Sequence, residues 1–117
     1  LISFVLFSRF TMIFFSFFLF YFVAGASHAV GVDIDPIAVT SAKQNALLNG
    51  FGSESLEVVL APSSSDNDEI SISDGAYDIV IANLLLNPVL QLSCNLLRYI
   101  RPGGCLGLSG ILESQVL

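Results

Sequence analysis

Residues 31–36, with the sequence GVDIDP, decide the fold of this chain because they join a strand to a helix. Val32 supplies the β-branched bulk that is typical of a buried strand. Asp35 can accept hydrogen bonds from the free amides of a first helical turn, and Pro36 suits the first helical position because its missing N–H would have no partner there. We therefore expect Asp33 at the carboxyl end of a strand.

The position of Asp33 makes it the first candidate for a site residue. In open α/β sheets, ligands bind at the carboxyl ends of the strands, and an acidic residue there commonly binds the hydroxyls of a nucleotide ribose. The other role open to Asp33 is to cap the helix that follows. Asp35 is better placed for capping, so we favour the ribose role for Asp33 if a cofactor binds.

Strand and helix patterns alternate through the rest of the chain, which predicts an α/β fold with a doubly wound, parallel sheet. Continuous β-branched bulk, as in YDIVIA, is typical of a parallel strand that is covered on both faces. After the strand that ends at Asp33, the pattern predicts a helix over residues 36–49, a strand over 56–61, a solvated loop rich in Ser and Asp over 62–76, a strand over 77–82, a helix from Asn87-Pro88 to residue 100, a turn at 101–104 and a strand over 105–111.

The amino-terminal part is different in composition, and we divide the chain into an apolar segment, residues 1–24, and a domain over residues 25–117. Residues 10–26 carry no charge and are crowded with phenylalanine. Three interpretations stay open: a membrane anchor or secretory signal, a replacement of a strand and helix of the domain, or foreign sequence from an incorrect gene boundary. In the second interpretation, residues 1–7 form a buried strand.

The charges restrict the partners of the chain. All ten acidic residues lie from Asp33 onward, and the net charge of the chain is −6. Such a surface repels phosphate backbones, so direct nucleic-acid binding is not expected, whereas a basic protein would be attracted to it. Cys94 and Cys105 lack metal-ligand spacing, which predicts free thiols in a reducing compartment and no metal site.

Three segments together resemble the class I S-adenosylmethionine-dependent methyltransferases, and more narrowly the ribosomal protein L11 methyltransferase family. They are GVDIDPIAVTSAKQNALLNG, IANLLLNP and RPGGCLGLSGILESQ. The resemblance implies a Rossmann-like methyltransferase sheet and S-adenosylmethionine as cofactor. It also implies transfer of a methyl group to an amine of a ribosomal protein, in the cytoplasm or an organelle.

The resemblance also implies roles for two residues. Asp33 corresponds to the acid that binds the ribose hydroxyls of the cofactor, and Asn83 corresponds to an asparagine between cofactor and substrate. The amide of Asn83 could orient an acceptor amine because it both donates and accepts hydrogen bonds. An asparagine that ends a strand is also an ordinary turn former. Asn87 fits a helix cap and Ser109 a loop hydroxyl better than either fits a ligand contact.

The family's glycine-rich loop is missing from the expected place. Counting back from Asp33, this loop should fall near residues 11–15, which read TMIFF. Phenylalanine rings would fill the space that the cofactor needs, and residues with side chains resist the positive φ angles of such loops. The family's central first strand must also come from residues 1–7, or the sheet is not stably closed. The sheet is thus expected to be incomplete and the activity of this chain impaired.

Two other hypotheses compete with the interpretation of this chain as a methyltransferase fragment. The first is a membrane-anchored or exported Rossmann-like module without enzymatic activity, which residues 10–26 suggest. The second is another nucleotide-binding enzyme such as a dehydrogenase, which also places an acid at this strand end. The dehydrogenase interpretation lacks a GxGxxG motif, and the segment IANLLLNP favours methyl transfer.

Overall fold

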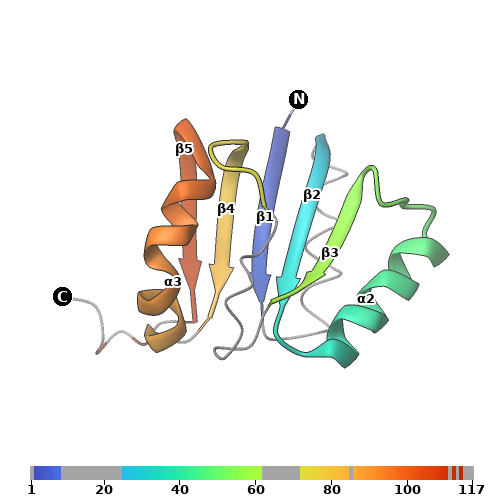
Figure 1. Ribbon diagram of the computed structural model, residues 1–117, viewed down its shortest axis with the longest axis horizontal. Coiled ribbons are helices and arrows are strands. Elements are labelled where there is room, and N and C mark those ends of the chain that lie inside the picture. Colours follow the sequence, from blue (N-terminus) through green and yellow to red (C-terminus); the bar gives the residue numbers. More distant parts are fainter. Residues whose placement is uncertain are drawn as a thin grey trace.

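The computed structural model describes residues 2–8, 25–61, 72–84 and 86–110, together with Leu112 and Ser114. In these residues the chain forms a five-stranded sheet in the order β3-β2-β1-β4-β5, and every pair of neighbouring strands is parallel (Figure 1). The predicted α/β, doubly wound class is therefore confirmed. The elements are β1 (Ile2–Ser8), β2 (Ala26–Asp33), α2 (Pro36–Leu48), β3 (Leu56–Leu60), β4 (Tyr77–Asn83), α3 (Leu86–Tyr99) and β5 (Ile100–Ser109).

Strand β1 occupies the centre of the sheet. Phe7 pairs with Val32 of β2 on one side and with Ala82 of β4 on the other. Parallel strands leave a row of unpaired backbone groups wherever a neighbour is missing, so β1 closes what would otherwise be two open edges. The structure thus has a strand where one of the three interpretations of the amino-terminal segment placed it.

The remainder of that segment, residues 9–24, lies outside the described residues. The predicted boundary at residue 24 and the other two interpretations therefore stay predictions. Among the helices that the structure describes, none has the length and apolar character needed to cross a membrane.

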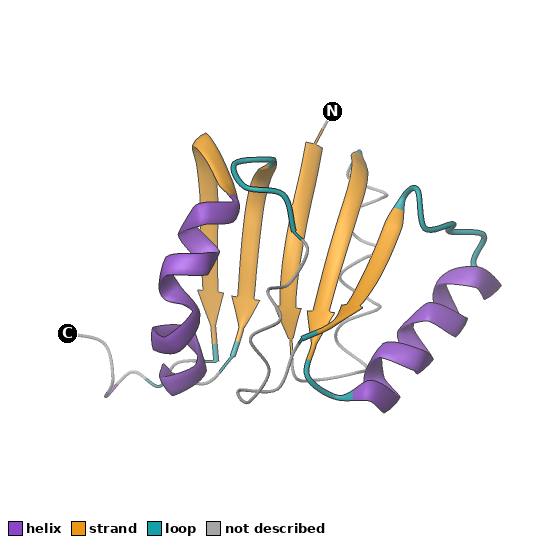
Figure 2. Ribbon diagram, in the orientation of Figure 1, coloured by secondary structure: helices purple, strands orange, loops and turns teal. Residues whose placement is uncertain are grey.

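The two described helices lie along different strands of the sheet (Figure 2), and each packs on a different face. Helix α3 contributes Leu96 to a core cluster that includes Val80 of β4. Helix α2 contributes Ala42 to a second cluster that includes Ala29 of β2. Val30, the neighbour of Ala29, belongs to the first cluster, and successive residues of a strand point to opposite faces. The sheet is therefore covered on both sides, as its apolar strands predict.

The segment between α3 and β5 differs from the prediction. The sequence predicts a turn over residues 101–104 and places Ile100 in the helix, but β5 already begins at Ile100. Tyr77 pairs with Ile100 and Ile79 with Cys105, so β5 uses more residues than β4 over this stretch and the register shifts. The Pro-Gly-Gly sequence thus forms an irregularity inside a strand, with Gly103 at a φ of 81°.

Two further predictions need correction. Helix α3 begins at Leu86, so Asn87 lies inside its first turn instead of preceding it. Ile72 falls in the predicted solvated loop, yet it is buried and joins the core cluster of α3. A single apolar residue in a polar segment has no periodicity that could reveal its burial. Residues 62–71 of that predicted loop lie outside the part of the chain that the structure describes.

Gly104 provides a test of the irregularity in β5. A Cβ at this position would lie 2.7 Å from the carbonyl oxygen of Asp78 and 2.6 Å from Cγ2 of Ile100. We expect Gly104→Ala to lower the free energy of unfolding by about 1–3 kcal/mol, because the added methyl group must displace backbone. Urea denaturation measures this change. Gly52→Ala is the matched control, since a Cβ there meets nothing within 4 Å; equal effects of the two substitutions would contradict the packing.

Tyr77 makes the free energy of unfolding depend on pH in the alkaline range. Burial raises the pKa of the Tyr77 phenol, and the negative charge of Glu57 and the nearby Tyr99 raise it further. A phenol that ionises less readily in the folded chain contributes stability below the unfolded pKa of about 10, and this stability is lost as pH rises through the folded pKa. We therefore expect the free energy of unfolding to fall less steeply above pH ~10 in Tyr77→Phe than in the wild type. The free energy of unfolding is measured by urea denaturation at a series of pH values. The same dependence on pH in Tyr77→Phe and the wild type would contradict the assignment.

Candidate functional site

The carboxyl ends of the parallel strands meet at one edge of the sheet, where the arrowheads lie in Figure 1. Ser8 ends β1 and pairs with Asn83, which ends β4; Asn83 pairs in turn with Ser109, which ends β5. Asp33 ends β2 on the other side of β1. The strand order reverses between β1 and β4, and ligands of open α/β sheets bind at such a point. The two predicted site residues, Asp33 and Asn83, thus lie at one edge and flank the central strand.

Asp33 is a buried carboxylate, and the described structure exposes only 3% of this residue. Its Oδ1 accepts a hydrogen bond from the backbone N–H of Asp35 at 2.9 Å. Asp35 caps helix α2, because its own Oδ1 accepts from the N–H of Ile37 at 2.9 Å. The predicted capping role of Asp35 is confirmed, and the ribose role of Asp33 remains a prediction.

Three exposed apolar residues are near Asp33 in the sequence or in the sheet. Ile34 and Ile37 follow it in sequence and are 55% and 74% exposed, and Leu60, its pairing partner in β3, is 47% exposed. Apolar side chains of this size are seldom left open to water without a use when they are grouped. Next to a carboxylate, such a rim could pack against the flat base of a nucleoside.

Asn83 is held by the end of the neighbouring strand. The hydroxyl of Ser109 donates a hydrogen bond to Oδ1 of Asn83 at 2.9 Å, and the carbonyl of Ser109 accepts from the N–H of Leu84 at 3.1 Å. The first bond fixes which way the amide of Asn83 faces. Ser109 therefore positions a candidate site residue, a role that sequence reasoning missed because it treated the Ser109 hydroxyl as part of a loop with no ligand or site partner.

Gly110 explains why the segments IANLL and LSGIL occur together. It has a φ of 85°, and a Cβ there would lie 2.7 Å from the carbonyl oxygen of Leu84 and 3.3 Å from Oδ1 of Asn83. Only glycine combines this backbone conformation with so close an approach. The two segments therefore meet at the end of β4, and their contact is part of the candidate site.

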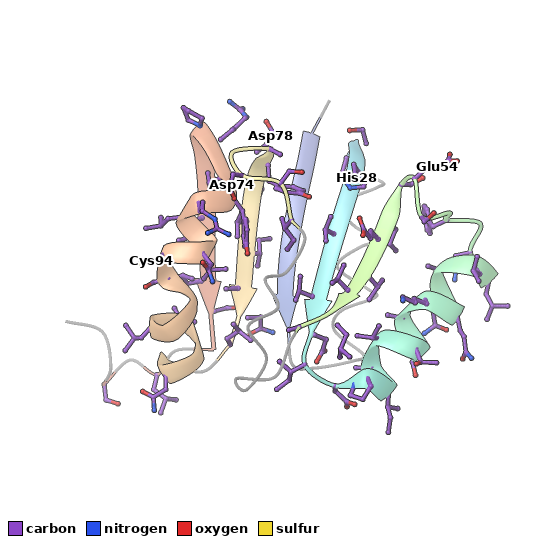
Figure 3. The ribbon with its side chains drawn as sticks, in the orientation of Figure 1. His28, Glu54, Asp74, Asp78 and Cys94 are labelled. Carbon is purple, nitrogen blue, oxygen red and sulfur yellow. The ribbon has the colours of Figure 1, made fainter. Side chains whose placement is uncertain are left out.

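The other charged groups with a described role lie away from this edge. Figure 3 shows His28, Glu54, Asp74 and Asp78 toward the amino-terminal ends of the strands. The carboxylates of Asp74 and Asp78 form ion pairs with Arg98 and Arg101, which tie α3 and β5 to the start of β4. These pairs thus serve the fold and not the candidate site.

The remaining residues that the sequence singled out are exposed in the described part of the chain. Cys94 and Cys105 are exposed free thiols, and Asn87 is exposed on α3. Among the described residues, no three His, Cys, Asp or Glu side chains are grouped as metal ligands. Residues 11–15, where the glycine-rich loop was expected, lie outside the described residues.

A shallow groove of about 330 Å³ lies between α2 and β3. Lys43 and Leu47 line it from the helix, and Phe51, Glu57 and Val58 line it from the chain that follows. Neither Asp33 nor Asn83 borders this groove, so it is separate from the candidate site.

Comparison with known proteins identifies the family. The family model described as ribosomal protein L11 methyltransferase matches residues 22–116. Among curated relatives with that name, the protein of Dechloromonas aromatica is 42% identical over 92 residues, which cover 79% of this chain and 27% of the relative. The protein of Aliivibrio salmonicida is 38% identical over 91 residues, 78% of this chain and 28% of the relative. The chain spans roughly a quarter of the length of these relatives.

Solved structures show the same fold. A ribosomal protein L11 methylase from Lactobacillus delbrueckii subsp. bulgaricus has a TM-score of 0.72 at 24% identity, covering 97% of this chain and 53% of that protein. A SAM-dependent methyltransferase from Aquifex aeolicus has a TM-score of 0.66 at 16% identity, covering 92% and 55%. M. capricolum TrmK, solved with S-adenosylhomocysteine, has a TM-score of 0.55 at 14% identity, covering 80% and 40%. These likenesses confirm a Rossmann-like methyltransferase fold.

Gly110 allows the geometry around Asn83 to be tested. We expect Gly110→Ala to lower the free energy of unfolding by about 1–3 kcal/mol more than Gly50→Ala does. Both glycines have positive φ, at 85° and 77°, but a Cβ at Gly50 meets nothing within 4 Å. The difference in urea denaturation thus isolates the contact with Leu84 and Asn83. The geometry would be wrong if the two substitutions were equally destabilising.

Proposed function

Because this chain belongs to the ribosomal protein L11 methyltransferase family, we propose that it is the nucleoside-binding core of an S-adenosylmethionine-dependent protein methyltransferase. The observation that supports this most directly is the buried carboxylate of Asp33, which ends β2 beside the point where the strand order reverses. The family is named for methylation of ribosomal protein L11, and the reaction that we propose for the whole protein is transfer of the methyl group to an amine of such a protein.

The described residues suit the nucleoside half of the cofactor. A carboxylate can accept hydrogen bonds from both hydroxyls of a ribose, and Oδ1 of Asp33 is already oriented by the N–H of Asp35. Ile34 and Leu60 supply an apolar rim for the base. Because Asp33 is enclosed, binding requires that the groups covering its carboxylate move aside. S-adenosylmethionine would supply the chemistry: an amine nitrogen can bond to the methyl carbon of the sulfonium while the thioether sulfur leaves.

Asn83 suits the acceptor side of the same edge. Its Oδ1 accepts from Ser109 and has a second lone pair for an N–H of the substrate amine. A neutral amine attacks through its own lone pair, so the protein must orient this nitrogen in line with the bond that breaks. An amide held by its neighbour can supply this orientation without taking part in proton transfer.

The charge of the chain suits a basic protein substrate. The net charge is −6, and the exposed residues include Asp35 and Glu57. Ribosomal proteins as substrates would place the reaction in the cytoplasm or in an organelle that contains ribosomes. The acidic surface would raise the rate of encounter with such a substrate, and salt would weaken the effect.

We propose that this chain retains the binding site for the nucleoside half of the cofactor and that its methyl transfer is impaired. The segment in the place of the glycine-rich loop reads TMIFF, whose side chains resist the close backbone approach that the methionine half of the cofactor needs. The nucleoside half depends on β2, β3 and α2, which the chain contains.

Substitution of two neighbouring acids tests the proposal. We expect the 117-residue chain to bind S-adenosylmethionine in isothermal titration calorimetry, and we expect Asp33→Asn to weaken this binding by about tenfold or more. A hydrogen bond to a charged acceptor contributes about 1.5–3 kcal/mol, which corresponds to that factor. Adenosine should show the same loss, because it contains the ribose and the base.

Asp35→Asn is the matched control. It removes the same charge two residues away, and asparagine caps helices as well as aspartate does, so affinity should stay within about threefold of the wild type. Equal weakening by both substitutions would mean that overall charge, not a contact with the ribose, governs binding. No binding of either ligand by the wild-type chain would overturn the proposal.

A further inference from the structure

Asp33, Asn83 and Ser109 end three of the parallel strands at one level of the sheet. Ser8 of β1 pairs with Asn83, Asn83 pairs with Ser109, and the register between β1 and β2 sets Asp33 level with Ser8. Residues at one level of a parallel sheet direct their side chains to the same face, and so do residues two apart on one strand. Ile81 packs against the core cluster of α2, so Asn83 and the residues level with it face the side of the sheet on which α2 lies.

The separation of Asp33 and Asn83 suits a nucleoside. Strand β1 lies between β2 and β4, and neighbouring strands are about 4.8 Å apart, so the backbones of the two residues are roughly 10 Å apart. A ribose that makes a hydrogen bond of about 2.9 Å at each end fits this separation. A nucleoside whose ribose hydroxyls meet Asp33 can therefore bring its 5′ carbon toward Asn83. In S-adenosylmethionine this carbon bears the sulfonium.

Two consecutive residues hold the acceptor atom of the Asn83 amide. The hydroxyl of Ser109 donates to Oδ1 of Asn83 at 2.9 Å. A Cβ at Gly110 would come within 3.3 Å of the same oxygen, so the amide fits beside residue 110 because that residue is glycine. None of the described residues accepts a hydrogen bond from Nδ2 of Asn83. One lone pair of Oδ1 and both N–H groups of Nδ2 are therefore left for a ligand.

We propose that Ser109 is a positioning residue for the methyl acceptor: it holds Asn83 so that the free lone pair of Oδ1 meets an amine beside the 5′ position of a nucleoside bound at Asp33. This role rests on the proposed function, because it requires the nucleoside. An amine that donates one N–H to this oxygen has its nitrogen oriented next to the reacting end of the cofactor. The hydroxyl of residue 109 is the group that matters, so threonine should replace serine and alanine should not.

The order of the Asn83 side chain tests the positioning without any ligand. In 15N relaxation measurements on the 117-residue chain, we expect an order parameter above about 0.8 for Nδ2 of Asn83, falling below about 0.6 in Ser109→Ala. Ser109→Thr should restore the wild-type value. Ser93→Ala removes a serine hydroxyl from α3 and should leave the order parameter unchanged. Equal order in the wild type and Ser109→Ala would overturn the proposal.

The backbone of Ser109 supplies a control for loss of structure. Its carbonyl accepts from the N–H of Leu84, and this bond does not involve the hydroxyl. Hydrogen exchange at the Leu84 N–H should therefore be the same in Ser109→Ala as in the wild type. Faster exchange at Leu84 together with lower order at Asn83 would mean that the substitution frays the end of β5. That result would contradict a specific role of the hydroxyl.

Two nucleosides test the consequence for binding. 5′-Amino-5′-deoxyadenosine carries an amine on the 5′ carbon, whereas 5′-deoxyadenosine carries no donor there. In isothermal titration calorimetry, Ser109→Ala should weaken binding of the amine at least about threefold and change binding of 5′-deoxyadenosine less than about twofold, because only the amine meets Asn83. Ser109→Thr should bind both as the wild type does.

The outcomes of this titration separate the two proposals. Equal weakening of both nucleosides by Ser109→Ala, or no weakening of either, would overturn the role of Ser109 and leave the nucleoside site in place. No binding of either nucleoside by the wild-type chain would overturn the proposed function, and the role of Ser109 in placing an amine would fall with it.

Discussion

The pairing of β1 with two neighbours is the interaction on which the rest of the structure depends. Residues 2–8 supply only seven residues, yet they join β2 and β3 on one side to β4 and β5 on the other. Each side alone would be a two-stranded ribbon, which is marginally stable in water. The register of β1 also determines the site, because it sets the ends of β2 and β4 level. Asp33 and Asn83 come from separate halves of the chain and share an edge only through this strand.

The parts of the fold that follow from local chemistry could be predicted from the sequence. Asp35 and Pro36 define the start of α2 by themselves, since a capping carboxylate and a residue without an N–H both suit a helix terminus. The parts that depend on tertiary pairing could not be predicted in this way. Glycine and proline in residues 101–104 are typical of a turn, but the pairing of Ile100 with Tyr77 draws them into β5.

The same distinction holds for the candidate site. The different roles of Asp33 and Asp35 follow from their places at a strand end and a helix start, and the structure confirms the capping half of that assignment. The bond from Ser109 to Asn83 joins residues 26 positions apart, and it exists only because β5 lies next to β4 in one register. No local pattern indicates such a bond. The sequence analysis placed Gly110 inside a strand over residues 105–111, whereas β5 ends at Ser109 and Gly110 follows it with a positive φ.

The end of β5 serves the sheet and the candidate site together. Ser109 directs its carbonyl to β4 and its hydroxyl to Asn83, so it belongs to the sheet and to the candidate site. Leu106 and Leu108 direct their backbone groups the opposite way, and their side chains lie on the face that carries Val80 and Ala82. Ser109 therefore restrains Asn83 only while the end of β5 stays paired with β4, and fraying of this strand end would release the amide.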